Sequence, residues 1–274
     1  MGIEIVGTGH ILKRSVAEVR ESISKELPDY VAVELDIKRF KALEGASFSP
    51  EAYRPVSIRE IIPTLWRGGS FPVFLQAALA MIQRELGEKY GTRPGADMCA
   101  AILSARAVGS RVLLIDRDIE VTLNRLMSVP LRELFTVLAS NREEDLQVIS
   151  GILQGNIEDI LKQENLDVLI GMLRNKHPYI YNALIDERDR YMAHALYKTQ
   201  EKHPESRILA VVGAGHKKGV AEYLEKMRCG QEIEITPLLE TKQVSVPRYV
   251  MLALLVSAAF ILMKSEFLFT KKRR

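Results

Sequence analysis

The pattern Gly-x-Gly-His occurs twice, near opposite ends of the sequence, as Gly7–His10 and Gly213–His216. Each copy follows a short apolar run, Ile3–Val6 in the first case and Ile208–Val212 in the second. Such runs are typical of strands buried in a parallel sheet, and the residues after each histidine have the periodicity of an amphipathic helix. We therefore expect an α/β protein with both histidines at the carboxyl ends of strands, where open α/β sheets bind their ligands.

Two more apolar runs predict strands at Val31–Leu35 and Arg111–Ile115. The segment before the first of them carries Ser15 with Glu18 three residues later, which is the pattern of a capping box at the start of a helix. A strand, a helix and a strand in close succession form a right-handed unit with parallel strands. The fold class is therefore α/β, with a mostly parallel or mixed central sheet and flanking helices, and a last short strand is predicted at Glu232–Ile235.

The middle of the chain predicts a helical insertion, at about residues 122–203, in an α/β domain of residues 1–246. This region has helical periodicity and no strand pattern. Its last helix is expected to run from Pro178, a residue favoured in first helical turns, to about Glu201. A further helix is predicted at Gly219–Met227, after the second glycine-histidine pattern.

Residues 247–274 predict a hydrophobic C-terminal helix with a basic tail. Tyr249–Met263 has fifteen residues without a charge, which span about 22 Å as a helix, less than the roughly 30 Å hydrocarbon core of a bilayer. Extension to Phe269 reaches about 31 Å and includes Lys264 and Glu266, which could snorkel to one interface. We expect membrane attachment here, with the domain on the cytoplasmic side because Lys271–Arg274 is basic. Packing on the domain, or on a partner in a homodimer, is the alternative.

The composition excludes several classes of protein. With 274 residues, 47% of them hydrophobic and 27% charged, the chain can bury a full-sized core and is not disordered. A net charge of only +3 without a basic face argues against nucleic acid as a partner. Cys99 and Cys229 stand far apart without paired spacing, which fits a reducing compartment and gives no sign of a zinc ribbon.

The predicted sheet brings two histidines and a glutamate, His10, His216 and Glu34, to one edge. Two imidazoles and a carboxylate can hold a catalytic metal ion that keeps open positions for water or substrate. For either histidine taken singly, capping of the following helix is an equally good interpretation.

Nucleotide binding is a further alternative, because Gly213, Gly215 and Gly219 form a glycine-rich pattern after a strand. That pattern alone is weak evidence, and it does not explain why His10 repeats the second motif.

Other charged side chains at strand and helix ends have two interpretations. Asp116–Asp118 follows a strand, and it is either a salt-bridged terminus or part of a site. The run Asp186–Arg190 is either a solvated helix face or a functional group of acids and guanidinium ions, and we favour the second. Arg39 could pair with Asp36 or hold a substrate carboxylate.

With these motifs in order, the sequence resembles the TraB/PrgY family, which is related to the TIKI metalloproteases and the wider EreA/ChaN-like group. The matching blocks span about Gly2 to Met227 and are Val6–His10 with Ser15, Val33–Asp36 with Arg39, Gly95–Met98 with Ala100–Ala101, Leu114–Asp118 with Thr122–Leu123, Glu187–Asp189 with Tyr191–Met192, and Val212–His216. No block is specific alone, but six blocks in order are.

The resemblance implies a mixed α/β core with two Gly-x-x-His motifs and a nearby acidic residue, similar to a divalent-metal peptidase site of the TIKI type. It also implies Asp97 as a weaker metal ligand, where the family more often has Glu. TraB/PrgY members themselves resemble membrane-associated regulators that shut down peptide-pheromone signalling.

We therefore predict a hydrolase that acts on peptides and depends on a divalent metal ion, Mn, Co or Zn. Its predicted ligands are His10, Glu34 and His216, with a metal-activated water as nucleophile. Glu187 is predicted as a general base or as a carboxylate that orients a ligand, and the predicted substrate-orienting residues are Arg39, Arg117 and Arg188. The alternative is a non-catalytic, membrane-associated regulator that binds or sequesters a peptide signal.

Overall fold

The computed structural model describes residues 2–9, 13–45, 47–48, 95–130, 132–133 and 163–240. Four strands form one sheet in the order β1-β4-β2-β3, and every neighbouring pair is parallel. Their bounds are β1 Gly2–Thr8, β2 Tyr30–Val33, β3 Arg111–Leu114 and β4 Arg207–Gly213. The predicted parallel α/β architecture is confirmed, and the strand before the second Gly-x-Gly-His motif lies between the first two strands of the chain.

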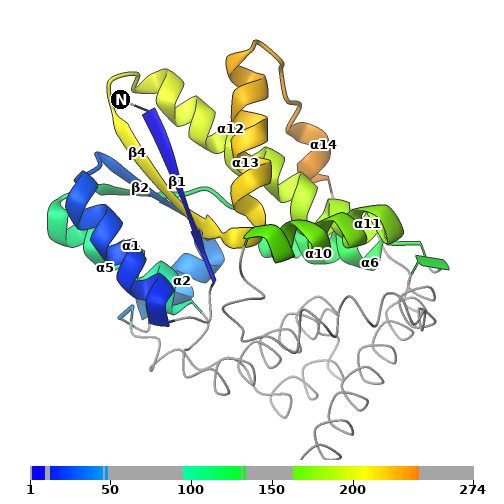
Figure 1. Cartoon of the computed structure of the whole chain (residues 1–274), viewed down its shortest axis with the longest axis horizontal. Helices are drawn as coiled ribbons and strands as arrows, with labels where there is room; N and C mark the ends of the chain where they lie inside the picture. Colours follow the sequence, from blue (N-terminus) through cyan, green and yellow to red (C-terminus); the bar gives the residue numbers. More distant parts are fainter. Residues whose placement is uncertain are drawn as a thin grey trace, which may run out of the picture.

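The helices cover both faces of this sheet (Figure 1). On one face lie α1 Lys13–Glu26, α2 Ile37–Gly45 and α5 Ala96–Val108. On the other face lie α12 Glu187–Lys202 and α13 Ala214–Arg228. The remaining helical segments are α6 Ile119–Met127, α10 Gln163–Lys176, α11 Pro178–Tyr181, the π-helix η1 Asn182–Asp186, and α14 Thr236–Leu239.

The central strand β4 shows why the sheet needs both layers. Leu209 and Val211 pack into the core on the side of α1 and α5. Ile208, Ala210 and Val212 pack into the core on the side of α12 and α13. After Arg207 the strand is apolar at every position, so it must be buried on both faces, since successive side chains point to opposite sides.

Two glycines lie at the ends of α5. Gly95 and Gly109 have φ of 80° and 79°, and they flank α5 on either side. Such left-handed conformations favour glycine. The small residues of α5, Ala100, Ala101 and Ala105, are buried, and α5 packs against β2 and β3.

The predicted helix from Pro178 to about Glu201 is interrupted by a π-turn. The chain is α-helical at Pro178–Tyr181, π-helical at Asn182–Asp186 and α-helical again from Glu187. A π-turn inserts an extra residue and rotates everything after it, and such turns are frequent at functional sites. The charged residues after Asp186 are therefore turned relative to a regular helix.

Two boundary predictions were wrong. Glu232–Ile235 forms no strand; Ile233 and Ile235 alternate with exposed glutamates, but the segment pairs with none of the described strands and leads into α14. Helix α13 begins at Ala214, well before the predicted start at Gly219, because Gly215 lies within its first turn rather than in a loop.

The predicted C-terminal helix at 247–274, and residues 134–162 of the predicted helical insertion, lie outside the described residues. No helix within the ranges that the structure describes is both long and apolar enough to cross a membrane.

Candidate functional site

The site is centred on His216, which lies in the first turn of α13 directly after β4. Its imidazole is buried, and Nδ1 lies 2.6 Å from Oδ1 of Asp189 on α12. Its Nε2 lies 2.9 Å from Nη1 of Arg188. Because a guanidinium only donates hydrogen bonds, Nε2 must accept, and Nδ1 therefore carries the proton that is donated to Asp189.

Glu34, which follows β2, joins the beginning of α13 to the same site. Its Oε2 accepts a hydrogen bond of 2.6 Å from the backbone N–H of Gly213, and its Oε1 lies 3.5 Å from Nε2 of His216. A carboxylate at a helix N-terminus is stabilised by the positive end of the helix dipole. In this position it occupies an N–H that a phosphate group would need, which weighs against the nucleotide-binding alternative.

Arg188 binds nearly every polar group of the site. Its Nε and Nη2 donate to the two oxygens of Asp116, at 3.2 and 2.7 Å, and Nη2 also donates to Glu34. Nη1 donates to His216 and, at 3.3 Å, to the carbonyl of Leu184. These contacts engage all five N–H groups of the guanidinium. Burial alone would lower the pKa of Arg188, but the carboxylates of Asp116 and Glu34 outweigh it and raise that pKa.

Asp116 follows β3 and is shared by two arginines. Arg39 donates to it as well as to Asp36, the latter at 2.6 Å, while Asp36 also accepts the backbone N–H groups at the start of α2. Burial would raise the pKa of Asp116, but Arg188 and Arg39 outweigh it and hold the pKa below its ordinary value. Arg39 is thus joined to His216 through Asp116 and Arg188.

Asp189 is the residue of this site that sequence reasoning missed. Burial raises the pKa of its carboxyl to about 6, although the hydrogen bond with His216 acts in the opposite direction. The sequence spacing instead places Glu187, Arg190 and His194 near one another on one face of a regular helix. Only the packing of α12 on α13 shows that Asp189 is the member that meets His216.

Arg117 and Glu187, two of the predicted catalytic residues, contact each other. Arg117 Nη1 donates to Glu187 at 2.6 Å, and the guanidinium also binds Thr122 and the carbonyls of Ala183 and Leu238, at 3.0, 3.0 and 2.9 Å. The Arg117 side chain is fully buried, and that burial lowers its pKa. This arrangement ties η1 to α14, and the catalytic roles of both residues stay predictions.

Asp97, the predicted weaker ligand, lies in the first turn of α5, beside Thr8 at the end of β1. Its Oδ2 accepts a hydrogen bond from the hydroxyl of Thr8, and its Oδ1 accepts the backbone N–H of Met98. His10 lies outside the described residues. Within the described ranges, no three His, Cys, Asp or Glu side chains are placed to hold one metal ion.

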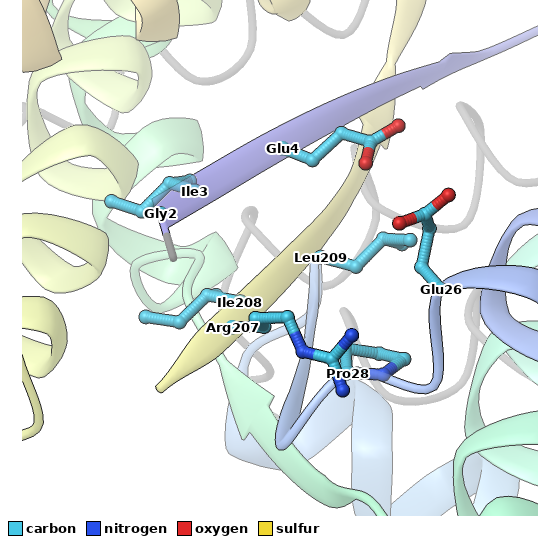
Figure 2. A pocket seen from close by; sticks show the side chains of 8 residues that line it. All are labelled: Gly2, Ile3, Glu4, Glu26, Pro28, Arg207, Ile208 and Leu209. Carbon is cyan, nitrogen blue, oxygen red and sulfur yellow. The ribbon is translucent and has the colours of Figure 1, made fainter. Parts of the chain in front are cut away.

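A separate pocket lies at the other edge of the sheet, where β1 and β4 begin (Figure 2). It is lined by Gly2–Glu4, Glu26, Pro28 and Arg207–Leu209. None of the predicted site residues lines it. The predicted ligands Glu34 and His216 instead meet at the carboxyl ends of the strands, as expected.

Comparison with known proteins gives a family match and one relative. The model of the TraB/PrgY/gumN family matches residues 2–234. A protein of Methanocaldococcus jannaschii, described only as uncharacterised, is 35% identical over 245 residues, which cover 88% of this chain. The chain spans 58% of the length of that relative.

Proposed function

The chain belongs to the TraB/PrgY/gumN family, and from this premise we propose that it is a divalent-metal-dependent hydrolase that acts on peptides. One observation carries the proposal: Asp189 holds the His216 ring so that Nε2 faces Oε1 of Glu34 at 3.5 Å. A metal-binding histidine almost always donates its other ring N–H to a carboxylate or carbonyl, which fixes the ring and its tautomer. His216 has that arrangement.

The donor atoms fit a divalent ion in kind and spacing. Metal bonds to histidine nitrogen and carboxylate oxygen are about 2.0–2.2 Å long, so two atoms 3.5 Å apart can share one ion. Thr8 pairs with Gly213, so the chain leaves β1 beside the start of the second motif. We propose His10, two residues further along the sequence, as the third ligand, and Asp97, through its contact with Thr8, as a lesser one.

Arg188 competes with a metal ion for the same two side chains. Its guanidinium binds Nε2 of His216 and Oε1 of Glu34, the atoms proposed as metal ligands. Two cations cannot share these atoms without strong repulsion. In our proposal Arg188 gives up these two contacts, keeps both bonds to Asp116 and turns the freed N–H groups to a substrate carbonyl.

The residues of the chain then have distinct tasks. When bound, the ion would activate a water molecule and polarise the scissile carbonyl. Asp189 keeps the Nδ1 proton of His216 in place, and Glu34 remains anchored on Gly213. Arg188 stabilises negative charge that develops on the carbonyl oxygen. Glu187 can act as the general base only if its carboxylate leaves Arg117.

One observation favours a second candidate function, a non-catalytic regulator that binds a peptide signal. In the described arrangement every N–H of Arg188 is already engaged, so none is available to a substrate. A site that stays in this closed state would bind a peptide signal without cleaving it.

For either function we propose membrane attachment through residues 249–263. Fractionation of the full-length chain without detergent tests this proposal.

The test compares metal content and cleavage in the same preparations. The purified chain is supplied with Mn²⁺, Co²⁺ or Zn²⁺ and incubated with mixed peptides, with and without a chelator. We expect chelator-sensitive cleavage that His216→Ala abolishes, while His194→Ala, which removes a half-buried ring of α12, cleaves like the parent. Metal binding without cleavage favours the regulator, and cleavage that resists the chelator contradicts the metal-dependent mechanism.

A further inference from the structure

We infer that Gly219 is a positioning residue for the proposed site, because its lack of a side chain provides the space through which Asp189 reaches His216. The inference rests on the proposed function of His216 as a ligand. It explains a glycine that the sequence had connected only with a nucleotide-binding pattern.

The space beside Gly219 is filled by one carboxylate. A Cβ atom at this position would lie 1.9 Å from Oδ2, 2.7 Å from Cγ and 3.3 Å from Cβ of Asp189. The first two separations are shorter than any that real Cβ atoms show, so the carboxylate would have to move. The same carboxylate binds Nδ1 of His216 through its other oxygen, at 2.6 Å. The carboxylate that needs the space beside Gly219 is therefore the same one that orients the His216 ring.

Backbone conformation does not explain this glycine. Gly219 lies inside α13 without a positive φ, where any residue could be accommodated by the main chain. Glycine in a helix interior is less favourable than alanine, so its presence has a local cost. A Cβ atom at Gly7 or Gly215, two other glycines of the motifs, would lie 3.2 or 3.6 Å from the nearest atom, and one at Gly171 in α10 would meet nothing within 4 Å.

The spacing of the motif follows from the helix. Positions three residues apart lie on the same face of an α-helix, so Gly219 lies beside His216 on the face that α12 covers. Asp189 projects from α12 into the notch above the glycine and contacts the ring. The sequence Gly-His-x-x-Gly thus combines the proposed ligand with the space for the carboxylate that orients it.

The expected effect of Gly219→Ala is displacement of the Asp189 carboxylate and loss of its hydrogen bond with His216. Loss of a residue that orients a metal ligand typically weakens metal affinity or activity by about 10- to 100-fold. Gly171→Ala is the matched control, since it makes the same change in a helix where nothing is displaced.

The primary readout is the ring N–H of His216, observed by NMR on the full-length chain with ¹⁵N-labelled histidine and assigned with His216→Ala. We expect a low-field, exchange-protected Nδ1–H signal in the parent and in Gly171→Ala, and its loss in Gly219→Ala and in Asp189→Ala. This readout needs neither metal nor substrate. Absence of metal binding and cleavage in the parent would therefore refute the proposed function while the NMR result still decides the role of Gly219.

A double variant keeps the inference testable if Gly219→Ala folds poorly. Asp189→Ala removes both atoms that would lie within 3.0 Å of the new Cβ atom. In that background, Gly219→Ala should cause no further loss of stability and should change Mn²⁺ affinity by no more than about twofold. An unchanged His216 signal in Gly219→Ala, or its equal loss in Gly171→Ala, would overturn the inference. If Gly219→Ala folds poorly, a double variant that folds no better would overturn it as well.

Discussion

Two arginines, the partly buried Arg188 and the fully buried Arg117, differ in the groups that balance their charge. Arg188 binds two carboxylates, those of Glu34 and Asp116, whereas Arg117 binds one, that of Glu187, and otherwise neutral oxygens. Burial alone lowers the pKa of each. The two carboxylates prevail at Arg188 and raise its pKa, while burial prevails at Arg117 and lowers its pKa.

The difference indicates what each position requires. Around Arg188, acidic side chains from the ends of β2 and β3 converge, so the position requires positive charge, which a metal ion could also supply. Around Arg117, the guanidinium joins the carbonyl of Ala183 in η1 to that of Leu238 in α14. That position requires several N–H groups in a fixed plane. The first arginine belongs to the proposed chemistry, and the second holds the helices around it.

The largest effect is expected for Arg188→Met, which leaves the carboxylates of Glu34 and Asp116 buried without their main cation. Breaking a buried ion pair by removing one partner costs about 3–5 kcal/mol. Urea unfolding at pH 7 measures this loss. Added Mn²⁺ should restore part of the stability, because it can neutralise Glu34. Unchanged stability, with or without Mn²⁺, would contradict the importance of charge at this position.

A smaller effect is expected for Arg117→Lys. Lysine can keep the ion pair with Glu187 but cannot reach the oxygens of Thr122, Ala183 and Leu238 together. We expect a loss of about 1–3 kcal/mol, the cost of an unsatisfied buried polar group. Mn²⁺ should not restore it in the same urea measurement. Equal rescue of both arginine variants by Mn²⁺ would remove the distinction between the two positions.

The smallest effect is expected for Thr122→Val, which preserves side-chain shape and removes the hydroxyl that accepts from Arg117 Nε at 3.0 Å. The net contribution of one such hydrogen bond is about 0.5–1.5 kcal/mol. Thermal unfolding with and without Mn²⁺ should show this loss independently of the metal. A loss of stability as large as that of Arg188→Met would mean that the hydrogen bonds of Arg117 matter as much for folding as the charged groups of the proposed site.

Local sequence patterns predicted much of the fold because strands and helix ends depend on nearby residues. The runs Ile3–Val6 and Ile208–Val212 lie within β1 and β4 as predicted. The second run is buried, whereas the first is only partly buried because β1 is an edge strand. The placement of Glu34 near His216 also followed from the rule that parallel strands share one carboxyl edge. The position of β4 between β1 and β2 could not be predicted from any short stretch of sequence, since strand order depends on contacts across the whole chain.

The remaining misses within the site have a similar cause. The π-turn at Asn182–Asp186 leaves no clear mark in the apolar periodicity, yet it sets how the following charged residues face the sheet. Asp189 and Glu187 are both acidic residues of one short run, and only tertiary packing assigns the first to His216 and the second to Arg117. Sequence chemistry identified the charged groups, but their pairing is a property of how α12 packs.

The most direct test of the account is calorimetric titration of the metal-free, full-length chain with Mn²⁺, Co²⁺ and Zn²⁺. The account predicts one site in the parent, a loss of affinity of 10-fold or more, on the order expected for loss of a ligand or its support, in His216→Ala and Glu34→Gln, and unchanged affinity in Arg117→Lys. A parent chain that binds none of the three ions, or equal affinity in all four proteins, would contradict the claim that His216 and Glu34 hold a divalent metal ion.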